Sequence, residues 1–258
     1  MRRREISPDP AALPSALRPY LGGRIYDTSS SGEARVYFLE DAGLYLKRSG
    51  KGALATEAKM TSYFYSLGLS VEVVDYISES EDWLLTVAGR GEDATAPQYL
   101  GDGRRLAAVL GEALRTLHDG EYPACPVPNR TADYLKTVEE RAALGIFDPS
   151  FLPEGLTLPA ADALALVREA APALCSRVLL HGDYCLPNIL LEDFRVSGFI
   201  DLGGAGIGDR HIDLFWGAWT LAYNLGTDRF REDFFAAYGQ DRVDRELLLA
   251  VAAAECFG

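Results

Sequence analysis

The sequence contains no apolar run that approaches the roughly 18 residues needed to span a membrane. The N-terminal stretch MRRREISPDP carries basic residues, but no apolar segment follows them, which argues against a signal peptide. The four cysteines (Cys125, Cys175, Cys185 and Cys256) are scattered, with no CxxC pair and no histidine spacing typical of a zinc site. These absences predict a reduced, cytoplasmic protein without a membrane partner.

Basic residues are too few to suggest a nucleic-acid partner. The 258-residue chain has 25 Lys and Arg residues against 38 Asp and Glu residues, for a formal net charge of −13. Proteins that bind nucleic acids usually present a basic face. The acidic balance would suit a cationic ligand, although many proteins are acidic for solubility alone.

The first third of the chain has the pattern of a small antiparallel sheet with one inserted helix. The runs ARVYFLE and GLYLKR are aromatic and β-branched, and the turn between them predicts a hairpin. A helical pattern follows and ends at Gly68. The strands are expected at residues 34–40, 43–48, 71–79 and 82–88.

The remainder of the chain, after GRGED at 89–93, is predicted to be mainly helical. Leu106, Leu110, Leu114 and Leu117 recur at the spacing of one helix face. Further helices are expected at 160–174 and 244–255, and the Pro-rich stretch 125–159 is expected to be irregular in part. The sequence thus predicts an α+β protein with two lobes, a sheet lobe over 1–88 and a larger helical lobe over 89–258.

A short polar loop, HGDYCLPN at 181–188, separates the apolar runs VLL and ILL. Gly182 and Pro187 interrupt regular structure, so the loop is expected between two strand-like segments. On its own, such a loop is as easily a turn whose Asp and Asn side chains bond their own backbone. Thirteen positions after Asn188, Asp201 follows the apolar run GFI, where it too could be a simple turn former.

Taken together, Asp183, Asn188 and Asp201 predict a metal-dependent phosphoryl-transfer site. Asp and Asn oxygens are ligands that suit Mg²⁺, and a carboxylate that is not bound to the metal can accept a proton from a hydroxyl group. Protein kinases carry the pattern H-R-D-x-x-x-x-N, whose Asp-to-Asn interval is repeated here, and the tripeptide DLG fits their later Asp-x-Gly.

The sheet lobe offers the other charged groups that such a site needs. Lys47 ends the strand GLYLK, where it can reach phosphates, and Glu57 lies on the following helix, where it can pair with Lys47. Taken singly, each is more simply explained as a solvated surface charge. Their order along the chain with the two later motifs is the order found in protein kinases, which favours the joint interpretation.

The segments HGDYCLPNILL and VSGFIDLGGAGIGDRHIDL closely resemble the aminoglycoside 3′-phosphotransferase family, and LYLK and EARVY are similar to its nucleotide lobe. The resemblance covers nearly the full length and is most specific between residues 180 and 214. It implies a protein-kinase-like fold and Mg²⁺-dependent transfer of the γ-phosphate of ATP or GTP to a 3′-hydroxyl of an aminoglycoside, a cationic small molecule. We also expect a monomer or a weak homodimer.

The resemblance implies a role for each motif residue. Asp183 would be the catalytic base, Asn188 and Asp201 would hold Mg²⁺, and Lys47 would contact the nucleotide phosphates with Glu57 as its ion-pair partner. The remaining nucleotide contacts would be Tyr45 stacked on adenine, Val87 and Gly89 in the hinge, and Ser29, Ser30 and Ser31 in a phosphate-covering loop that lacks the kinase G-x-G-x-x-G pattern.

Other residues near the motifs are assigned supporting roles. Arg210 would help to neutralise the transferred charge. Asp213 is expected to buttress the HGDYCLPN loop, and His181 is expected to orient it by hydrogen bonds rather than to act as an acid or base.

Carboxylates for a cationic substrate are expected in two regions besides Asp183. The segment FDPSFLPEGL is similar to an acidic substrate loop of the family, which nominates Asp148 and Glu154. The ending AAAECFG nominates Glu255, although Ala254 stands where the family commonly has Asp and Gly258 follows Phe257.

Three functions remain open on the sequence. The first is an aminoglycoside kinase, and the second is a kinase of the same fold that acts on another small hydroxylated substrate, such as a sugar or an amino alcohol. The third is a nucleotide-binding module without catalysis, against which the intact Asp183, Asn188 and Asp201 argue. The aromatic residues Trp216, Trp219 and Tyr223 are more simply core packing than a surface for a sugar ring.

Overall fold

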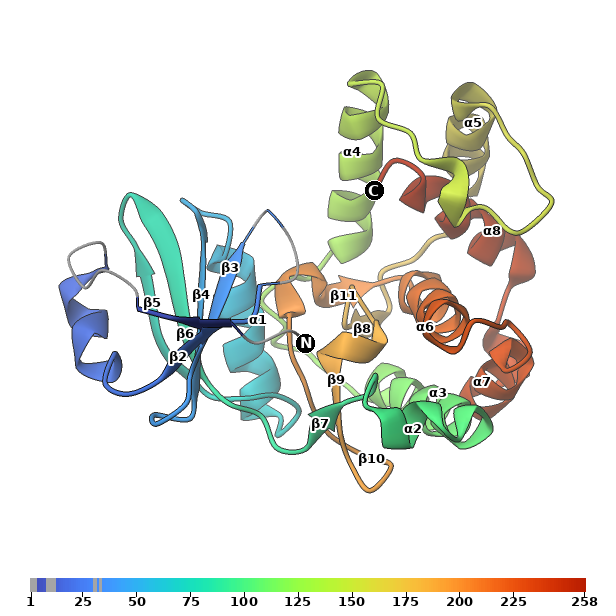
Figure 1. Cartoon of the computed structure of the whole chain (residues 1–258). Coiled ribbons are helices and arrows are strands. Elements are labelled where there is room, and N and C mark those ends of the chain that lie inside the picture. The colour runs from blue at the N-terminus through green and yellow to red at the C-terminus, as the bar shows by residue number, and fades with distance from the viewer. Residues whose placement is uncertain (1–3, 8–12, 30–31, 33) are drawn as a thin grey trace. The chain divides into compact units, whose positions relative to one another are not determined.

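The computed structural model describes residues 4–7, 13–29, 32 and 34–258 (Figure 1). The chain divides into two compact units. The first comprises the described residues of Met1–Arg90 together with Ser197–Gly203, and the second comprises Gly91–Val196 and Gly204–Gly258.

A six-stranded antiparallel sheet forms most of the first unit, in the order β1-β2-β3-β4-β6-β5. The predicted strands are present as β3 to β6. The sequence prediction missed β1 and β2, because three residues are too few to show an alternating pattern. The strands are β1 (Arg4–Ile6), β2 (Ile25–Asp27), β3 (Arg35–Leu39), β4 (Leu44–Gly50), β5 (Val73–Ser78) and β6 (Glu81–Val87).

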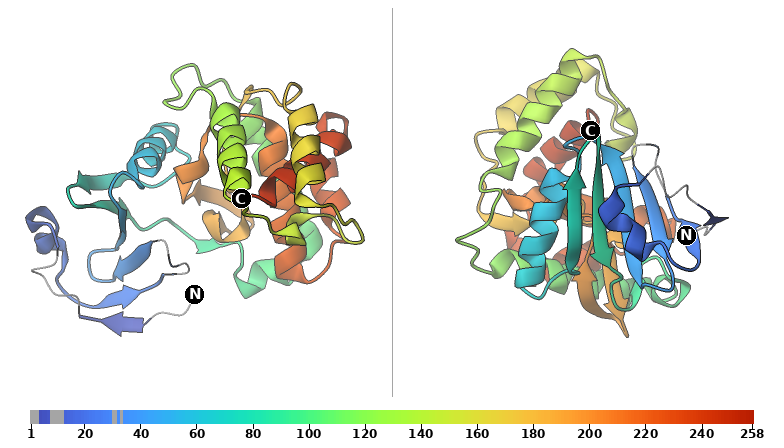
Figure 2. Two further views of the ribbon diagram at one scale, coloured as in Figure 1. Left: turned by 90° about the horizontal axis from the view of Figure 1, so that it is seen from above. Right: turned by 90° about the vertical axis from the view of Figure 1, so that its left-hand side faces the viewer.

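Alternation along β4 gives the sheet two different faces. Leu44 and Leu46 point into a core that they share with Leu17 of the 3₁₀ helix η2 (Ser15–Tyr20). Helix α1 (Ala55–Ser66) covers the opposite face, where Ala58 packs against Leu84 (Figure 2). Because Lys47 is paired with Leu84 in the β4–β6 register, it lies on the α1 face.

Helices make up most of the second unit. Helix α3 buries Leu106, Leu110 and Leu114, as its periodicity predicts. It packs closely on α7, since a Cβ atom on Gly111 would lie only 2.4 Å from the carbonyl oxygen of Phe234. The helices are α2 (Pro97–Leu100), α3 (Gly103–Asp119), α4 (Arg130–Ala143), α5 (Ala160–Ala170), α6 (Arg210–Leu225), α7 (Arg231–Tyr238) and α8 (Arg245–Glu255).

The remaining short strands and 3₁₀ turns flank the polar loops, and β10 and η5 each have residues in both units. Strand β8 pairs with β11 and strand β7 pairs with β9, both antiparallel. These elements are β7 (Glu92–Asp93), β8 (Val178–Leu180), β9 (Ile189–Glu192), β10 (Arg195–Phe199), β11 (Gly206–Gly208), η3 (Pro149–Phe151), η4 (Leu186–Asn188), η5 (Leu202–Gly204) and η6 (Gln240–Arg242).

The stretch 125–159 is irregular in part, as predicted, but its middle forms the 14-residue helix α4. Asn129 caps this helix by accepting a hydrogen bond from the backbone N–H of Ala132. Helices α4, α5 and α8 lie side by side (Figure 2). The predicted α+β class, with an antiparallel N-terminal sheet and a mainly helical remainder, is confirmed. None of the described helices has the length and apolar character to cross a lipid bilayer.

Candidate active site

Lys47, Glu57 and Asp201 come together in the first unit. The Lys47 ammonium nitrogen lies 2.7 Å from a carboxylate oxygen of Glu57 and 2.7 Å from a carboxylate oxygen of Asp201. Strand β4 supplies Lys47, helix α1 supplies Glu57, and the turn after β10 supplies Asp201. The Lys47–Glu57 ion pair expected from the sequence is therefore present, and Asp201 shares the same cation.

Burial and pairing act against each other in this cluster. Burial disfavours the Lys47 ammonium, but the attraction of Glu57 and Asp201 outweighs it and raises the pKa of Lys47 above its usual value. Burial raises the pKa of Glu57, and the Lys47 charge only partly offsets that effect. Lys47 therefore keeps its charge, which the predicted contact with nucleotide phosphates requires.

Asp201 has an unusual backbone for a residue with a side chain. Its φ angle is 60°, in the left-handed region that Asp and Asn adopt more readily than other residues with a Cβ. The contact with Lys47 uses one carboxylate oxygen, and 48% of the side chain is exposed. A second carboxylate oxygen is therefore available for a metal ion.

Tyr45 lies on the same face of β4 as Lys47, two residues earlier, so the two side chains emerge roughly 7 Å apart. Its ring packs against Phe38, with 4.9 Å between the ring centroids. The stacking of Tyr45 on adenine stays a prediction.

The other predicted nucleotide contacts are backbone positions and hydroxyl groups. The N–H of Val87 donates to the carbonyl oxygen of Glu72 at 3.0 Å. The predicted hydrogen bond to adenine would therefore use the carbonyl oxygen of Val87 as the acceptor. Gly89 is half-buried just after β6. The Ser29 hydroxyl accepts the N–H of Val36 at 2.9 Å, which fixes the start of its loop. Ser30 and Ser31 lie outside the described residues.

The HGDYCLPN loop of the second unit runs from β8 to β9, as the apolar runs predicted. Its own hydrogen bonds hold Asp183. The Asn188 amide nitrogen donates to the Asp183 carbonyl oxygen at 3.1 Å and to Oδ2 of its carboxylate at 2.8 Å. The N–H of Asp183 donates to Nδ1 of His181 at 3.3 Å, in line with an orienting role for that histidine.

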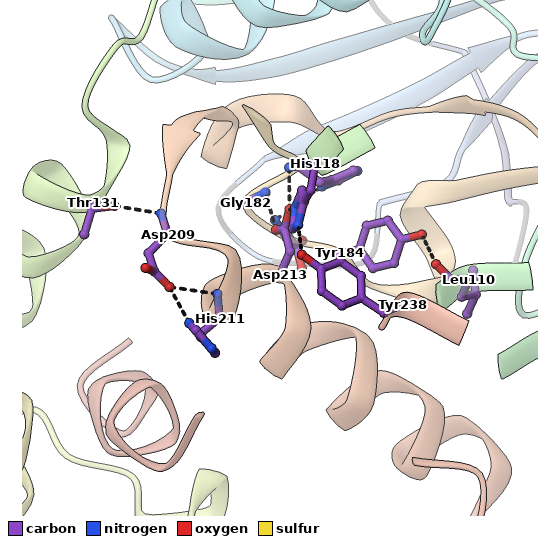
Figure 3. Close-up of polar contacts among 11 residues, drawn as sticks. Leu110, His118, Thr131, Gly182, Tyr184, Asp209, His211, Asp213 and Tyr238 are labelled. Carbon is purple, nitrogen blue, oxygen red and sulfur yellow. Dashed lines mark hydrogen bonds and ion pairs between the residues drawn. The ribbon is translucent and has the colours of Figure 1, made fainter. Parts of the chain in front are cut away.

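Asp213 supports this loop from α6. Its carboxylate is fully buried and accepts the backbone N–H groups of His181 at 2.7 Å and Gly182 at 2.8 Å (Figure 3). Two charge-assisted hydrogen bonds to adjacent peptide groups fix both the position and the orientation of the loop. The predicted buttressing role of Asp213 is confirmed.

Gly182 and Gly204 bring two backbone segments of the second unit into contact. Gly182 has a φ angle of 84°, and a Cβ atom at this position would lie 1.9 Å from the carbonyl oxygen of Gly204. A Cβ atom on Gly204 would lie 2.7 Å from the carbonyl oxygen of Gly182. Neither position has room for a side chain, so the loop is held by a backbone crossing as well as by Asp213.

A cavity of about 220 Å³ opens beside Asp183. Glu255 lines it from α8 and is only 6% exposed. Its carboxyl oxygen Oε1 accepts hydrogen bonds from the Tyr134 hydroxyl at 2.9 Å and from the Trp216 indole nitrogen at 3.1 Å. Burial raises the pKa of Glu255 to about 7, although these two donors favour the charged form.

The other residues expected to meet a substrate are placed differently. Asp148 and Glu154 are exposed and do not line this cavity. Asp148 caps η3 by accepting the N–H of Ser150 at 2.9 Å, which lowers its pKa. Arg210 begins α6, and its charge acts on the Tyr238 hydroxyl. The functional roles of these residues stay predictions.

Sequence reasoning missed Tyr134 and assigned Trp216 mainly to core packing. Trp216 does pack against a hydrophobic core cluster, and it also forms part of the cavity wall. Trp219 packs against the same cluster and stacks on Tyr223 further along α6, with 5.0 Å between ring centroids. No motif marks Tyr134. Only its position on one face of α4 could have indicated a role for Tyr134, and that helix was not predicted from the sequence.

The donor set fits a hard divalent cation. Within the part of the chain that the structure describes, no group of three or more His, Cys, Asp or Glu side chains could hold a metal ion. Asn188 turns its amide nitrogen to Asp183, so its amide oxygen is the atom able to ligate, and Asp201 has a carboxylate oxygen beyond its Lys47 contact. Each of these two residues, one in each unit, thus offers an oxygen atom of the kind that Mg²⁺ prefers, and their role as metal ligands stays a prediction.

Comparison with known proteins identifies relatives over almost the whole chain. Residues 19–248 match the model of the phosphotransferase enzyme family. A probable aminoglycoside 3′-phosphotransferase of Lactococcus lactis is 43% identical, with 99% of this chain and 97% of that protein covered. A streptomycin 3″-kinase of Streptomyces griseus is 33% identical, with 80% of each chain covered.

Solved structures show the same fold. An aminoglycoside phosphotransferase of Streptomyces rimosus superposes with a TM-score of 0.75 and 27% identity, covering 90% of this chain and 91% of that chain. That enzyme has also been solved with ADP and streptomycin. A type VIII aminoglycoside 3′-phosphotransferase gives a TM-score of 0.72 at 26% identity, covering 90% of this chain and 91% of the other.

Proposed function

The chain belongs to the phosphotransferase enzyme family, and from that membership we propose that it transfers the γ-phosphate of ATP or GTP to a 3′-hydroxyl group of an aminoglycoside, with Mg²⁺ as the metal ion. The family predicted from the HGD and GFID motifs is thereby confirmed. One observation carries the proposal for the substrate: Asp183, the predicted base, lines the same cavity as the buried carboxyl group of Glu255.

Asp183 is arranged to accept a proton. Asn188 donates to its Oδ2 oxygen, and Oδ1 would take the proton of an acceptor hydroxyl group as the oxygen of that group attacks phosphorus. Lys47, held by Glu57, would bind the nucleotide phosphates. When bound, Mg²⁺ would neutralise charge on the phosphate oxygens, with Asn188 and Asp201 as its protein ligands. Phosphoryl transfer needs this positioning and charge neutralisation more than covalent chemistry.

The size and lining of the cavity bear on the substrate. At about 220 Å³ it is smaller than the roughly 300–1,000 Å³ typical of ligand pockets, so it would hold one ring of an aminoglycoside rather than the whole molecule. Trp216 and Tyr134 offer aromatic surface, and Glu255 offers a carboxylate for an ammonium group.

A second candidate function rests on how few carboxylates surround this cavity. Asp148 and Glu154 lie outside it, and Ala254, which lines it next to Glu255, carries no charge. A neutral sugar or an amino alcohol needs fewer counter-charges than a polycation. A kinase of the same fold with such a substrate is therefore the alternative.

We expect turnover with kanamycin and none with a 3′-deoxy aminoglycoside such as tobramycin. The measurement is a coupled assay of nucleoside-diphosphate release with Mg²⁺, run with ATP and GTP in parallel against both compounds, neomycin and simple sugars. Equal turnover of kanamycin and tobramycin would contradict transfer to the 3′-hydroxyl. Turnover of simple sugars alone would establish the second candidate.

The affinity for a cationic acceptor should depend on pH through Glu255. Because its pKa is about 7, the carboxylate forms as the pH rises from about 6 to about 8, and KM for the aminoglycoside should fall over that range. The amines of the acceptor titrate as well, so the wild type is compared with Glu255→Gln on the same acceptor. The difference between their KM profiles should follow the ionisation of Glu255, and parallel profiles would remove Glu255 from substrate binding.

The same ionisation should lower stability. The pKa of Glu255 in the folded protein lies above its ordinary value of 4.5. The stability contributed by the protonated group is therefore fully present below the unfolded pKa and is lost as the pH rises through about 7. Thermal unfolding should show this loss in the wild type and not in Glu255→Gln.

A further inference from the structure

A buried chain of hydrogen bonds leads from α7 to the HGDYCLPN loop (Figure 3). The Tyr238 hydroxyl oxygen lies 2.9 Å from Nδ1 of His118, and Nε2 of the same ring lies 3.2 Å from Oδ2 of Asp213. Asp213 in turn accepts the N–H groups of His181 and Gly182. The side chains of Tyr238 and Asp213 are fully buried and His118 is 5% exposed, so water does not compete for these bonds.

With a neutral His118 ring, the chemistry of its two partners fixes the direction of each hydrogen bond in this chain. A carboxylate only accepts, so the ring nitrogen that faces Asp213 must carry a hydrogen atom. In a neutral imidazole the other nitrogen, Nδ1, is then an acceptor, and Tyr238 must donate to it. Burial raises the pKa of Tyr238 to about 12, so its hydroxyl group keeps the proton that it donates.

We propose that Tyr238 is a positioning residue for phosphoryl transfer. Its hydroxyl group selects the His118 tautomer that carries hydrogen on Nε2, and that tautomer holds the Asp213 carboxylate beneath the backbone of residues 181–182. The proposal rests on the proposed function of the loop and adds a group that touches neither substrate nor nucleotide.

The opposite tautomer would weaken the support of the loop. With hydrogen on Nδ1, the lone pair of Nε2 would face the Asp213 carboxylate, and a hydrogen bond would be replaced by repulsion between two acceptors. Asp213 would then be free to rotate away from one of its two peptide N–H donors. Asp183 follows Gly182 directly, so a small displacement there moves the base relative to the acceptor hydroxyl, to which rates are sensitive.

The test is Tyr238→Phe, which removes the hydroxyl group and keeps the buried ring. We expect kcat to fall about 10-fold to 100-fold. The KM values for nucleotide and acceptor should change less than about twofold, because no binding group is altered. Long-range ¹H–¹⁵N correlation spectra of the histidine rings should show hydrogen on Nε2 of His118 in the wild type and a shift toward the Nδ1 form in the variant.

Tyr99→Phe is the matched control. The Tyr99 hydroxyl is also buried and donates to a backbone carbonyl group, that of Leu191, at 2.8 Å. It has no part in the chain from α7 to the loop. Both variants should therefore lose a similar amount of thermal stability, while only Tyr238→Phe changes kcat and the tautomer of His118.

Each result decides between distinct conclusions. Unchanged kcat in Tyr238→Phe would overturn the positioning role, and reduced kcat with an unchanged tautomer would overturn tautomer selection as its cause. A wild type with no turnover of any aminoglycoside would refute the proposed function instead. The tautomer comparison needs no substrate, so it would still establish or refute the selection of the His118 tautomer by Tyr238.

Discussion

Replacing Asp183 with Asn is expected to lower kcat by about 10²-fold to 10⁴-fold, the usual contribution of a general base. The amide has nearly the same shape, and its oxygen can still accept the hydrogen bond from Asn188. The loop should therefore keep its conformation while losing the atom that takes the proton. Coupled assays of turnover, with calorimetric titration of Mg-nucleotide, separate the loss of chemistry from the loss of binding.

Nucleotide affinity should survive this change. Lys47, Glu57 and Tyr45 belong to the first unit and owe their positions to contacts within it. Asp193→Asn serves as the control, since Asp193 is exposed in the turn between β9 and β10 and Asn tolerates its φ of 48°. Normal turnover in Asp183→Asn would remove Asp183 from the chemistry, and equal losses in both variants would indicate a general effect of the lost charge.

Replacing Asp213 with Asn should damage both stability and catalysis. The carboxylate accepts two backbone N–H groups and faces Nε2 of His118, whereas an amide offers only one accepting oxygen. At least one buried donor would lose its partner, which costs about 1–3 kcal/mol. Urea unfolding should show this loss, and kcat should fall about 10²-fold because the backbone that carries Asp183 is released.

Asp241→Asn is the comparison for that experiment. Asp241 is exposed in η6, so its replacement should change the free energy of unfolding by less than about 0.5 kcal/mol. A stable Asp213→Asn protein with full activity would show that the backbone crossing of the loop suffices without the carboxylate. A stable protein with reduced kcat would indicate that Asp213 serves positioning more than folding.

The groups predicted well from sequence are those tied to a local pattern. Asp183 and Asn188 lie in one short loop, so their spacing alone constrains their geometry, and their hydrogen bond is observed. The Lys47–Glu57 pair follows from a strand end and the first turn of the next helix. In both cases few residues separate the partners, and the local secondary structure determines how their side chains are oriented.

The groups that were missed depend on contacts between distant segments. Tyr134 and Glu255 are 121 positions apart, and His118 and Tyr238 are 120 positions apart. Each pair meets only because helices pack at a particular angle and register, which periodicity does not specify. Glu255 was predicted as a carboxylate for the substrate, which stays a prediction, and its burial beside Tyr134 and Trp216 could be seen only in the tertiary structure.

The crossing of Gly182 and Gly204 limits which amino-acid substitutions this chain can tolerate during evolution. Every amino-acid replacement of glycine introduces a Cβ atom, and at these two positions that atom would collide with the main chain of the other. Neither residue has a functional group, yet both codons can change only by synonymous substitution unless the two segments separate. Selection should therefore act as strongly on Gly182 and Gly204, which have no functional side chain, as on Asp183.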